Sequence, residues 1–168
     1  MKTCMVFMLI PAVLFFLSSC KLKVETTAVD IEAEKEAIKA VIFGETQAWV
    51  DRDMAKFNSF YVQDAYQTRV MATCDTSSIT HGWDSLSKQM NNINWTGVEN
   101  VKFSKDFVDI KVMDNTAWAI YKEKQNADVN GKAMENHLLL TMVLEKKEGN
   151  WKISCLSIYY WPAKEGEK

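Results

Sequence analysis

Apolar residues at helical spacing open the chain after residue 30, and they share one face of a helix predicted over 31–52: Ile31, Ile38, Val41, Ile42 and Trp49. Asp30 is suited to cap this helix, and Glu32 and Glu34 favour the positive end of its dipole. Gly44 inside the helix costs stability relative to alanine. We therefore expect another element or an aromatic ring to approach Gly44 closely.

Two shorter helices are predicted downstream. The first covers 54–61 and carries Phe57, Phe60 and Tyr61. The second begins after Gly82, covers 83–91, and places Leu86 and Met90 one turn apart on the same face.

The pattern becomes strand-like after Trp95. Val108, Ile110 and Val112 alternate with polar residues, whereas Phe103 and Phe107 fall on the opposite parity. This change of parity predicts a bulge near Asp106, and a bulge would curve the sheet.

Three turn sequences divide the rest of the chain into strands. Asp114-Asn115, Asn130-Gly131 and Glu148-Gly149-Asn150 precede strands predicted over 116–124, 133–146 and 151–161, and Pro162 ends the last one. Three helices followed by an antiparallel meander predict an α+β fold.

The strands predicted over 133–146 and 151–161 contain apolar residues on both faces, notably in 138–144 and 153–161. In a sheet with one solvent-exposed face, apolar and polar residues would alternate along each strand instead. Because three helices can cover only one face, we expect a second subunit on the other. The sequence therefore predicts a homodimer through the sheet.

The N-terminal segment resembles a bacterial lipoprotein signal. An apolar run follows Lys2 and ends in Leu17-Ser18-Ser19-Cys20; it is too short to span a bilayer but has signal-peptide length. We expect a signal peptide at 1–19, a lipidated Cys20 in a tether at 20–29, a domain at 30–163 and a tail at 164–168. The alternatives are an ordinary cysteine after a secretory signal and an uncleaved anchor.

The predicted location follows from this anchor. Acyl chains on Cys20 would hold the protein stably at a membrane of the bacterial cell envelope. Lys21 is not an aspartate-type retention signal, so the outer membrane is expected by resemblance to other lipoproteins.

Charge and cysteines limit the partners. The formal net charge is −2, and no run of Lys or Arg offers a polyanion a basic stripe, so nucleic acid is not an expected partner. Beyond Cys4 and Cys20, only Cys74 and Cys155 remain as thiols. They either form a disulfide in the oxidising envelope or stay free, and the apolar pattern around Cys155 favours a buried, inert thiol.

Three segments resemble the SnoaL-like branch of the nuclear transport factor 2-like superfamily. The first runs from Ala48-Trp49-Val50-Asp51-Arg52 through Phe60-Tyr61 to Asp64-Ala65. The second is His81-Gly82-Trp83, and the third is Glu148-Gly149-Asn150-Trp151-Lys152-Ile153. The resemblance implies a cone-shaped barrel in which three N-terminal helices pack in a strongly curved sheet around a pocket, often in a dimer.

The resemblance does not imply one function, because relatives include isomerases, cyclases, dehydratases and pocket proteins without known chemistry. Residues expected around the cone mouth give the candidate ligand contacts: Trp49, Tyr61, Tyr66, Arg69, Trp83 and His137. The aromatic rings could hold an apolar ligand, and Arg69 could fix an anionic end. For Trp49 and Trp151, packing in the core is the stronger interpretation.

Catalytic chemistry is not identified by any motif. Asp64 falls in a turn motif, His81 is expected to be a loop or capping residue, and a strand histidine such as His137 is more often structural. Neither histidine has a helix-spaced carboxylate, so no metal or other cofactor is expected. We predict an envelope lipoprotein that binds a small, mostly apolar molecule or acts as an interaction module. The alternative is an isomerase, cyclase or hydrolase that uses acid–base residues of the pocket.

Overall fold

The structure is a computed structural model that describes residues 30–161. The expected signal at 1–19, tether at 20–29 and tail at 164–168 lie outside the described residues. Within them, no helix combines the length and apolar character needed to cross a bilayer.

Three helices form where the sequence predicts them. Helix α1 spans Ile31–Val50, and the Asp30 carboxylate caps it by accepting hydrogen bonds from the backbone N–H groups of Glu32 and Ala33. Helix α2 spans Met54–Ser59, and helix α3 spans Trp83–Asn91. The predicted ends of α1 and α2 extend two residues beyond the observed ones, where each helix closes in a turn.

The antiparallel meander is also confirmed. Strands β3 (Val98–Met113), β4 (Thr116–Val129), β5 (Lys132–Lys147) and β6 (Asn150–Trp161) pair in sequence order. Asp114, Asn130 and Glu148 have positive φ angles in the three connecting turns. The short polar side chains of Asp114 and Asn130 tolerate this conformation better than apolar ones.

Two strands were missed by the sequence analysis. Strands β1 (Thr68–Ala72) and β2 (Ser77–His81) form a hairpin, and β1 then pairs with β6 in parallel. The sheet is therefore mixed rather than purely antiparallel. His81 ends β2, where its Nδ1 lies 3.0 Å from Oγ1 of Thr68, so the expectation that it is a loop or capping residue was wrong.

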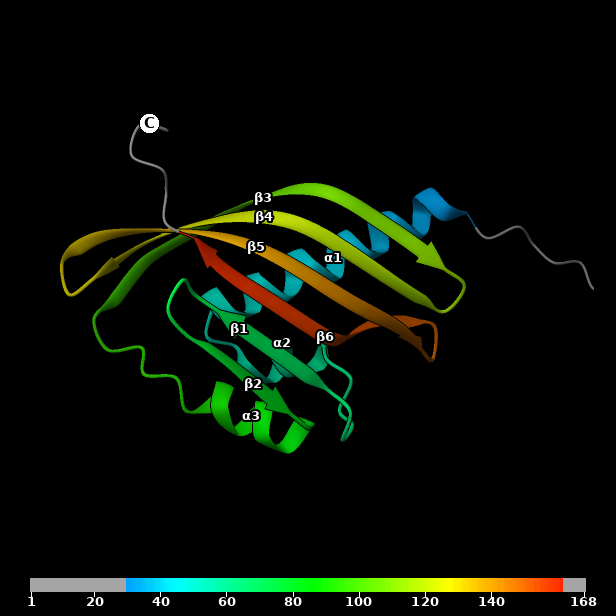
Figure 1. Ribbon diagram of the computed structural model, residues 1–168, viewed down its shortest axis with the longest axis horizontal. Helices are drawn as coiled ribbons and strands as arrows, with labels where there is room; N and C mark the ends of the chain where they lie inside the picture. The colour runs from blue at the N-terminus through cyan, green and yellow to red at the C-terminus, as the bar shows by residue number, and fades with distance from the viewer. Residues whose placement is uncertain (1–29, 162–168) are drawn as a thin grey trace, which may run out of the picture.

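The sheet is large and curved but not closed. Its order is β2-β1-β6-β5-β4-β3, which leaves β2 and β3 as edges, and Figure 1 shows the long strands bending around α1. The predicted bulge lies between Phe107 and Asp109, and further irregularities follow Glu99 and Val143. The expected cone is thus present as an open sheet and not as a complete barrel.

The core lies between α1 and the inner face of the sheet. Its fully buried side chains include Ile38, Ile42, Tyr121, Met142 and Ile153. The close approach predicted at Gly44 is also present, because a Cβ at this position would stand 2.7 Å from Cζ of Phe60. This contact seats the end of α2 against α1.

Candidate functional site

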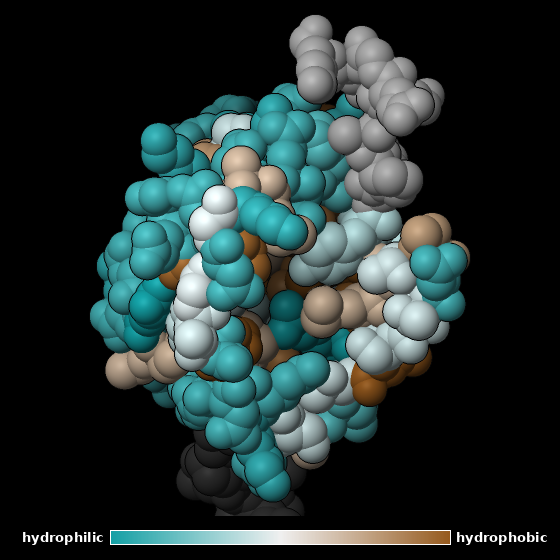
Figure 2. Space-filling view, turned by 90° about the vertical axis from the view of Figure 1, so that its left-hand side faces the viewer, coloured by the Kyte–Doolittle hydropathy of each residue, from teal (hydrophilic) through white to brown (hydrophobic). Residues whose placement is uncertain are grey.

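A cavity of about 280 Å³ lies between α1, α3 and the inner face of the sheet. This volume is at the lower end of the range for ligand pockets. Figure 2 shows a hollow in one face of the molecule, with hydrophobic and hydrophilic side chains inside it. The cavity can therefore admit a small molecule.

The sheet supplies an apolar wall. Side chains alternate between the two faces of a strand, so every second residue points into the cavity. The strand residues that form this wall are Met71, Leu138, Leu140, Met142, Leu156 and Ile158.

The helices close the opposite side. Trp49 of α1, Phe57 of α2 and Met90 of α3 line the cavity. The ring of Trp95 packs on Trp49 with 4.7 Å between centroids, and the Arg52 guanidinium lies over Trp95. Trp49 thus both lines the cavity and packs against the core. It therefore fits both interpretations drawn from the sequence, a ligand contact and a core residue.

Glu45 is one of two buried carboxyl groups that line the cavity, and Glu123 is the other. Glu45 is 7 % exposed, accepts a hydrogen bond of 2.6 Å from the Tyr61 hydroxyl, and accepts another of 3.0 Å from Oγ1 of Thr46. Burial raises the pKa of Glu45, although these hydrogen bonds and the charge of Lys105 oppose the change. The protonated form of the Glu45 carboxyl group is therefore more favoured in this site than it would be in water.

Tyr61 lies behind Glu45. It is buried, and burial together with the neighbouring Glu45 charge raises the pKa of its hydroxyl well above the usual value. The hydroxyl therefore stays protonated and acts as a donor to Glu45.

A buried ion pair lies beside Glu45 and Thr46 on the polar side of the cavity. The Lys105 ammonium group pairs with Glu123, and the side chains of these residues are 0 % and 2 % exposed. Lys105 also donates to Oγ1 of Thr46 over 2.8 Å, and Gln125 donates to Glu123 over 2.5 Å. These contacts satisfy Glu123 before any ligand enters.

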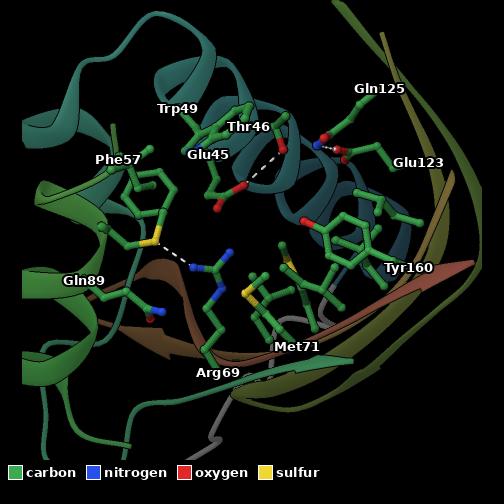
Figure 3. A pocket seen from close by; sticks show the side chains of 17 residues that line it. Glu45, Thr46, Trp49, Phe57, Arg69, Met71, Gln89, Glu123, Gln125 and Tyr160 are labelled. Atoms are coloured by element: carbon green, nitrogen blue, oxygen red, sulfur yellow. Dashed lines mark hydrogen bonds between the residues drawn. The ribbon is translucent and has the colours of Figure 1, made fainter. Parts of the chain in front are cut away.

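Arg69 enters the cavity from β1. Figure 3 shows its guanidinium pointing from the strand side toward Glu45 on α1. Nη1 donates to Sδ of Met90 over 2.7 Å, while the buried Nε has no hydrogen-bond partner among residues 30–161. Thioether sulfur is a weak acceptor, so the charge of Arg69 is poorly compensated.

The structure brings Trp49 and Arg69 into the cavity and places Tyr61 directly behind it. The other three residues expected at the mouth lie elsewhere. Tyr66 is 42 % exposed and donates to Glu145, and Trp83 packs beside Tyr61 with 6.2 Å between ring centroids without lining the cavity.

His137 faces away from the cavity. Its neighbour Leu138 points inward, so strand alternation turns the imidazole to the outer face. There it lies 2.8 Å from a carboxylate oxygen of Glu135.

Sequence reasoning missed Glu45, Glu123 and Tyr160, which all line the cavity. A signal for Glu45 was present, because positions 38, 42, 45 and 49 share one helical face. Glu123 likewise shares its strand parity with Ala119 and Tyr121, which are buried.

No group of three or more metal-ligating side chains occurs within 30–161. Cys74 and Cys155 are both free thiols, with Cys74 exposed and Cys155 half-buried. Burial raises the pKa of the Cys155 thiol, consistent with the inert thiol expected from its strand pattern.

Known structures share this architecture at low sequence identity. A putative dehydratase of the NTF2-like family from Streptomyces avermitilis gives a TM-score of 0.67 at 15 % identity, over 79 % of this chain and 99 % of that one. A hexachlorocyclohexane dehydrochlorinase, LinA-type3, from Novosphingobium barchaimii gives 0.62 at 16 %, over 80 % and 93 %. A ketosteroid isomerase-like protein from Erwinia carotovora atroseptica gives 0.61 at 13 %, over 77 % and 98 %.

A search of curated proteins found no match. The SnoaL-like domain family matches residues 38–158, which covers most of the chain from α1 to β6. This match, together with the open curved sheet and its pocket, identifies the chain as a member of the SnoaL-like domain family within the NTF2-like superfamily.

Proposed function

We propose that this protein is an envelope-anchored lipoprotein whose SnoaL-like domain binds a small, mostly apolar molecule. The observation that carries the binding function is the cavity of about 280 Å³ with its apolar strand wall. Binding sites for small molecules combine such walls with a few polar groups. Such polar groups in this cavity include Glu45, Arg69, Gln89 and Tyr160.

Native mass spectrometry of the protein purified gently from its own host tests ligand binding. A co-purifying species should be displaced when Leu140 or Leu156 in the apolar wall is replaced by a charged residue. A species that stays bound to both variants would contradict binding in this cavity.

Anchoring through Cys20 rests on the lipoprotein-type signal. Labelling cells with radioactive palmitate should mark the wild-type protein and leave Cys20→Ala unlabelled. Cys155→Ala is the matched control, because this cysteine lies within the folded domain. Equal labelling of Cys20→Ala would contradict the anchor.

General acid–base catalysis is a second candidate, favoured by the buried carboxyl of Glu45 in the cavity. Catalytic acids and bases are commonly groups whose pKa values are shifted by burial. Proteins that share this fold include a dehydrochlorinase, so hexachlorocyclohexane is a reasonable first compound to assay. Turnover that Glu45→Gln abolishes would support catalysis, whereas turnover unchanged in Glu45→Gln would exclude this residue.

A further inference from the structure

Arg69 is a half-buried cation without an anionic partner among residues 30–161. Its guanidinium carries five N–H donors, and the one acceptor bonded to it within residues 30–161 is the sulfur of Met90. Its Nε is buried and has no partner, and no carboxylate of the described chain lies within ion-pair distance. A charge that is partly withdrawn from water is stabilised by a partner of opposite sign, so Arg69 is suited to receive an anionic group.

The other charged or ionisable side chains of the cavity, Glu123 and Glu45, already have hydrogen-bond partners. Lys105 neutralises Glu123, and Gln125 occupies the second Glu123 oxygen. Burial favours the neutral form of Glu45, which Tyr61 and Thr46 also hydrogen-bond. Within residues 30–161, Arg69 is therefore the charged group of the cavity lining that lacks an oxygen or nitrogen partner.

The planar shape of the Arg69 guanidinium favours one kind of anionic partner. A planar guanidinium matches a carboxylate through two parallel hydrogen bonds. The rest of the cavity is largely an apolar wall, with Leu138, Leu140, Leu156 and Ile158 on the strands. A single guanidinium beside such a wall suits a singly charged acid with an apolar body better than a multiply charged phosphate.

We propose that the ligand is a small organic acid, with its carboxylate held by Arg69 and its apolar body against the strand wall. This inference rests on the proposed binding function and names the chemical class of its ligand.

Octanoate and octanol separate the contribution of the carboxylate from that of the apolar body. The full chain in lipid nanodiscs is titrated with each probe by calorimetry, with empty nanodiscs as the blank. Octanoate should bind at least tenfold more tightly than octanol, and Arg69→Met should lose more than tenfold in octanoate affinity because it removes the cation that pairs with the carboxylate. Octanol affinity should stay within about threefold, since its apolar contacts remain.

Arg52→Met is the matched control, because it removes the same charge from a site over Trp95 outside the cavity lining. It should bind octanoate like the wild type, and Arg69→Lys should retain part of the affinity. The thermal midpoint of ligand-free Arg69→Met gives an independent measurement. A partly buried charge without a counter-ion opposes folding, so this midpoint should equal or exceed that of the wild type.

Two results would overturn the carboxylate inference while leaving the pocket function intact. One is equal affinity for octanoate and octanol that Arg69→Met does not change, and the other is a lower thermal midpoint in Arg69→Met, which would make Arg69 a structural residue. If the wild type binds neither octanoate, octanol, benzoate nor benzyl alcohol, the proposed binding function fails and the inference fails with it.

Discussion

Tyr61 donates a hydrogen bond of 2.6 Å to Oε1 of Glu45, and this bond joins the segment after α2 to the C-terminal half of α1 inside the core. Both residues are buried. The bond therefore satisfies a carboxyl oxygen that water cannot reach freely.

Tyr61→Phe should destabilise the protein by about 1–3 kcal/mol, because it leaves this buried acceptor without its donor. The free energy of unfolding in urea measures the effect. Tyr159→Phe is the control, since Tyr159 is 48 % exposed, and it should change stability by less than about 0.5 kcal/mol. Equal effects of the two substitutions would show that the Tyr61 hydroxyl contributes nothing specific.

Glu45 should make the folded protein less stable as pH rises. In the unfolded chain its pKa is near 4.5, and burial raises that pKa in the folded state against the opposing influence of Tyr61, Lys105 and Thr46. Between the two values the unfolded chain releases a proton that the folded protein retains, so stability falls with pH. The contribution is fully present below the unfolded pKa, and its loss is complete only above the folded pKa.

Glu45→Gln should remove this contribution. Unfolding free energies measured at pH 4 and pH 8 should show a smaller decline with pH in Glu45→Gln than in the wild type. Glu36→Gln, on the exposed side of the same helix, should follow the wild-type profile. A decline that is unchanged in Glu45→Gln would contradict the raised pKa.

Among the charged residues, Lys105 should be one of those whose substitution lowers the stability of the protein most. Its side chain is fully buried, pairs with Glu123 and lies over the ring of Tyr121 at 4.6 Å. Lys105→Met leaves the Glu123 carboxylate buried without its cation, which should cost about 3–5 kcal/mol. Urea unfolding measures this loss.

The double variant Lys105→Met/Glu123→Leu should recover much of that stability, because the unpaired charge is gone. Lys39→Met breaks a surface pair with Glu36 and should cost at most about 1 kcal/mol. If the double variant is no more stable than Lys105→Met, the cost comes from lost packing around Lys105 rather than from an unpaired charge.

The sequence predicts the fold well where local patterns determine structure. The Asp30 cap, the close contact at Gly44 and the three hairpin turns all depend on near neighbours or on backbone conformation. Strand β1 was missed because its five residues pair in parallel with β6, about 85 positions away, and no local pattern encodes such a partner.

The site was predicted less completely for a related reason. Arg69 and Trp49 reach the cavity as expected, but the position of His137 depended on strand parity relative to a cavity that the sequence does not locate. Glu45 was overlooked because charged residues on a helix are usually solvated. Its place on the same helical face as Ile38 and Ile42 was the stronger signal.

The dimer predicted from the apolar strands stays a prediction, and the outer face of the sheet shows where to test it. Val143 lies on this face between Trp118 of β4 and Cys155 of β6, and all three are half-buried rather than covered. A second copy packed on this face would bury them, so a charge at the centre should separate the subunits.

Val143→Lys should halve the mass measured by light scattering at micromolar concentration while keeping the wild-type circular dichroism spectrum. Ser78→Lys adds the same charge to the exposed edge strand β2 and should leave the mass unchanged. A wild-type protein that is already monomeric would contradict the predicted dimer. A dimer unaffected by Val143→Lys would place the interface elsewhere, since a lysine buried between two apolar sheets has no partner to offset its desolvation.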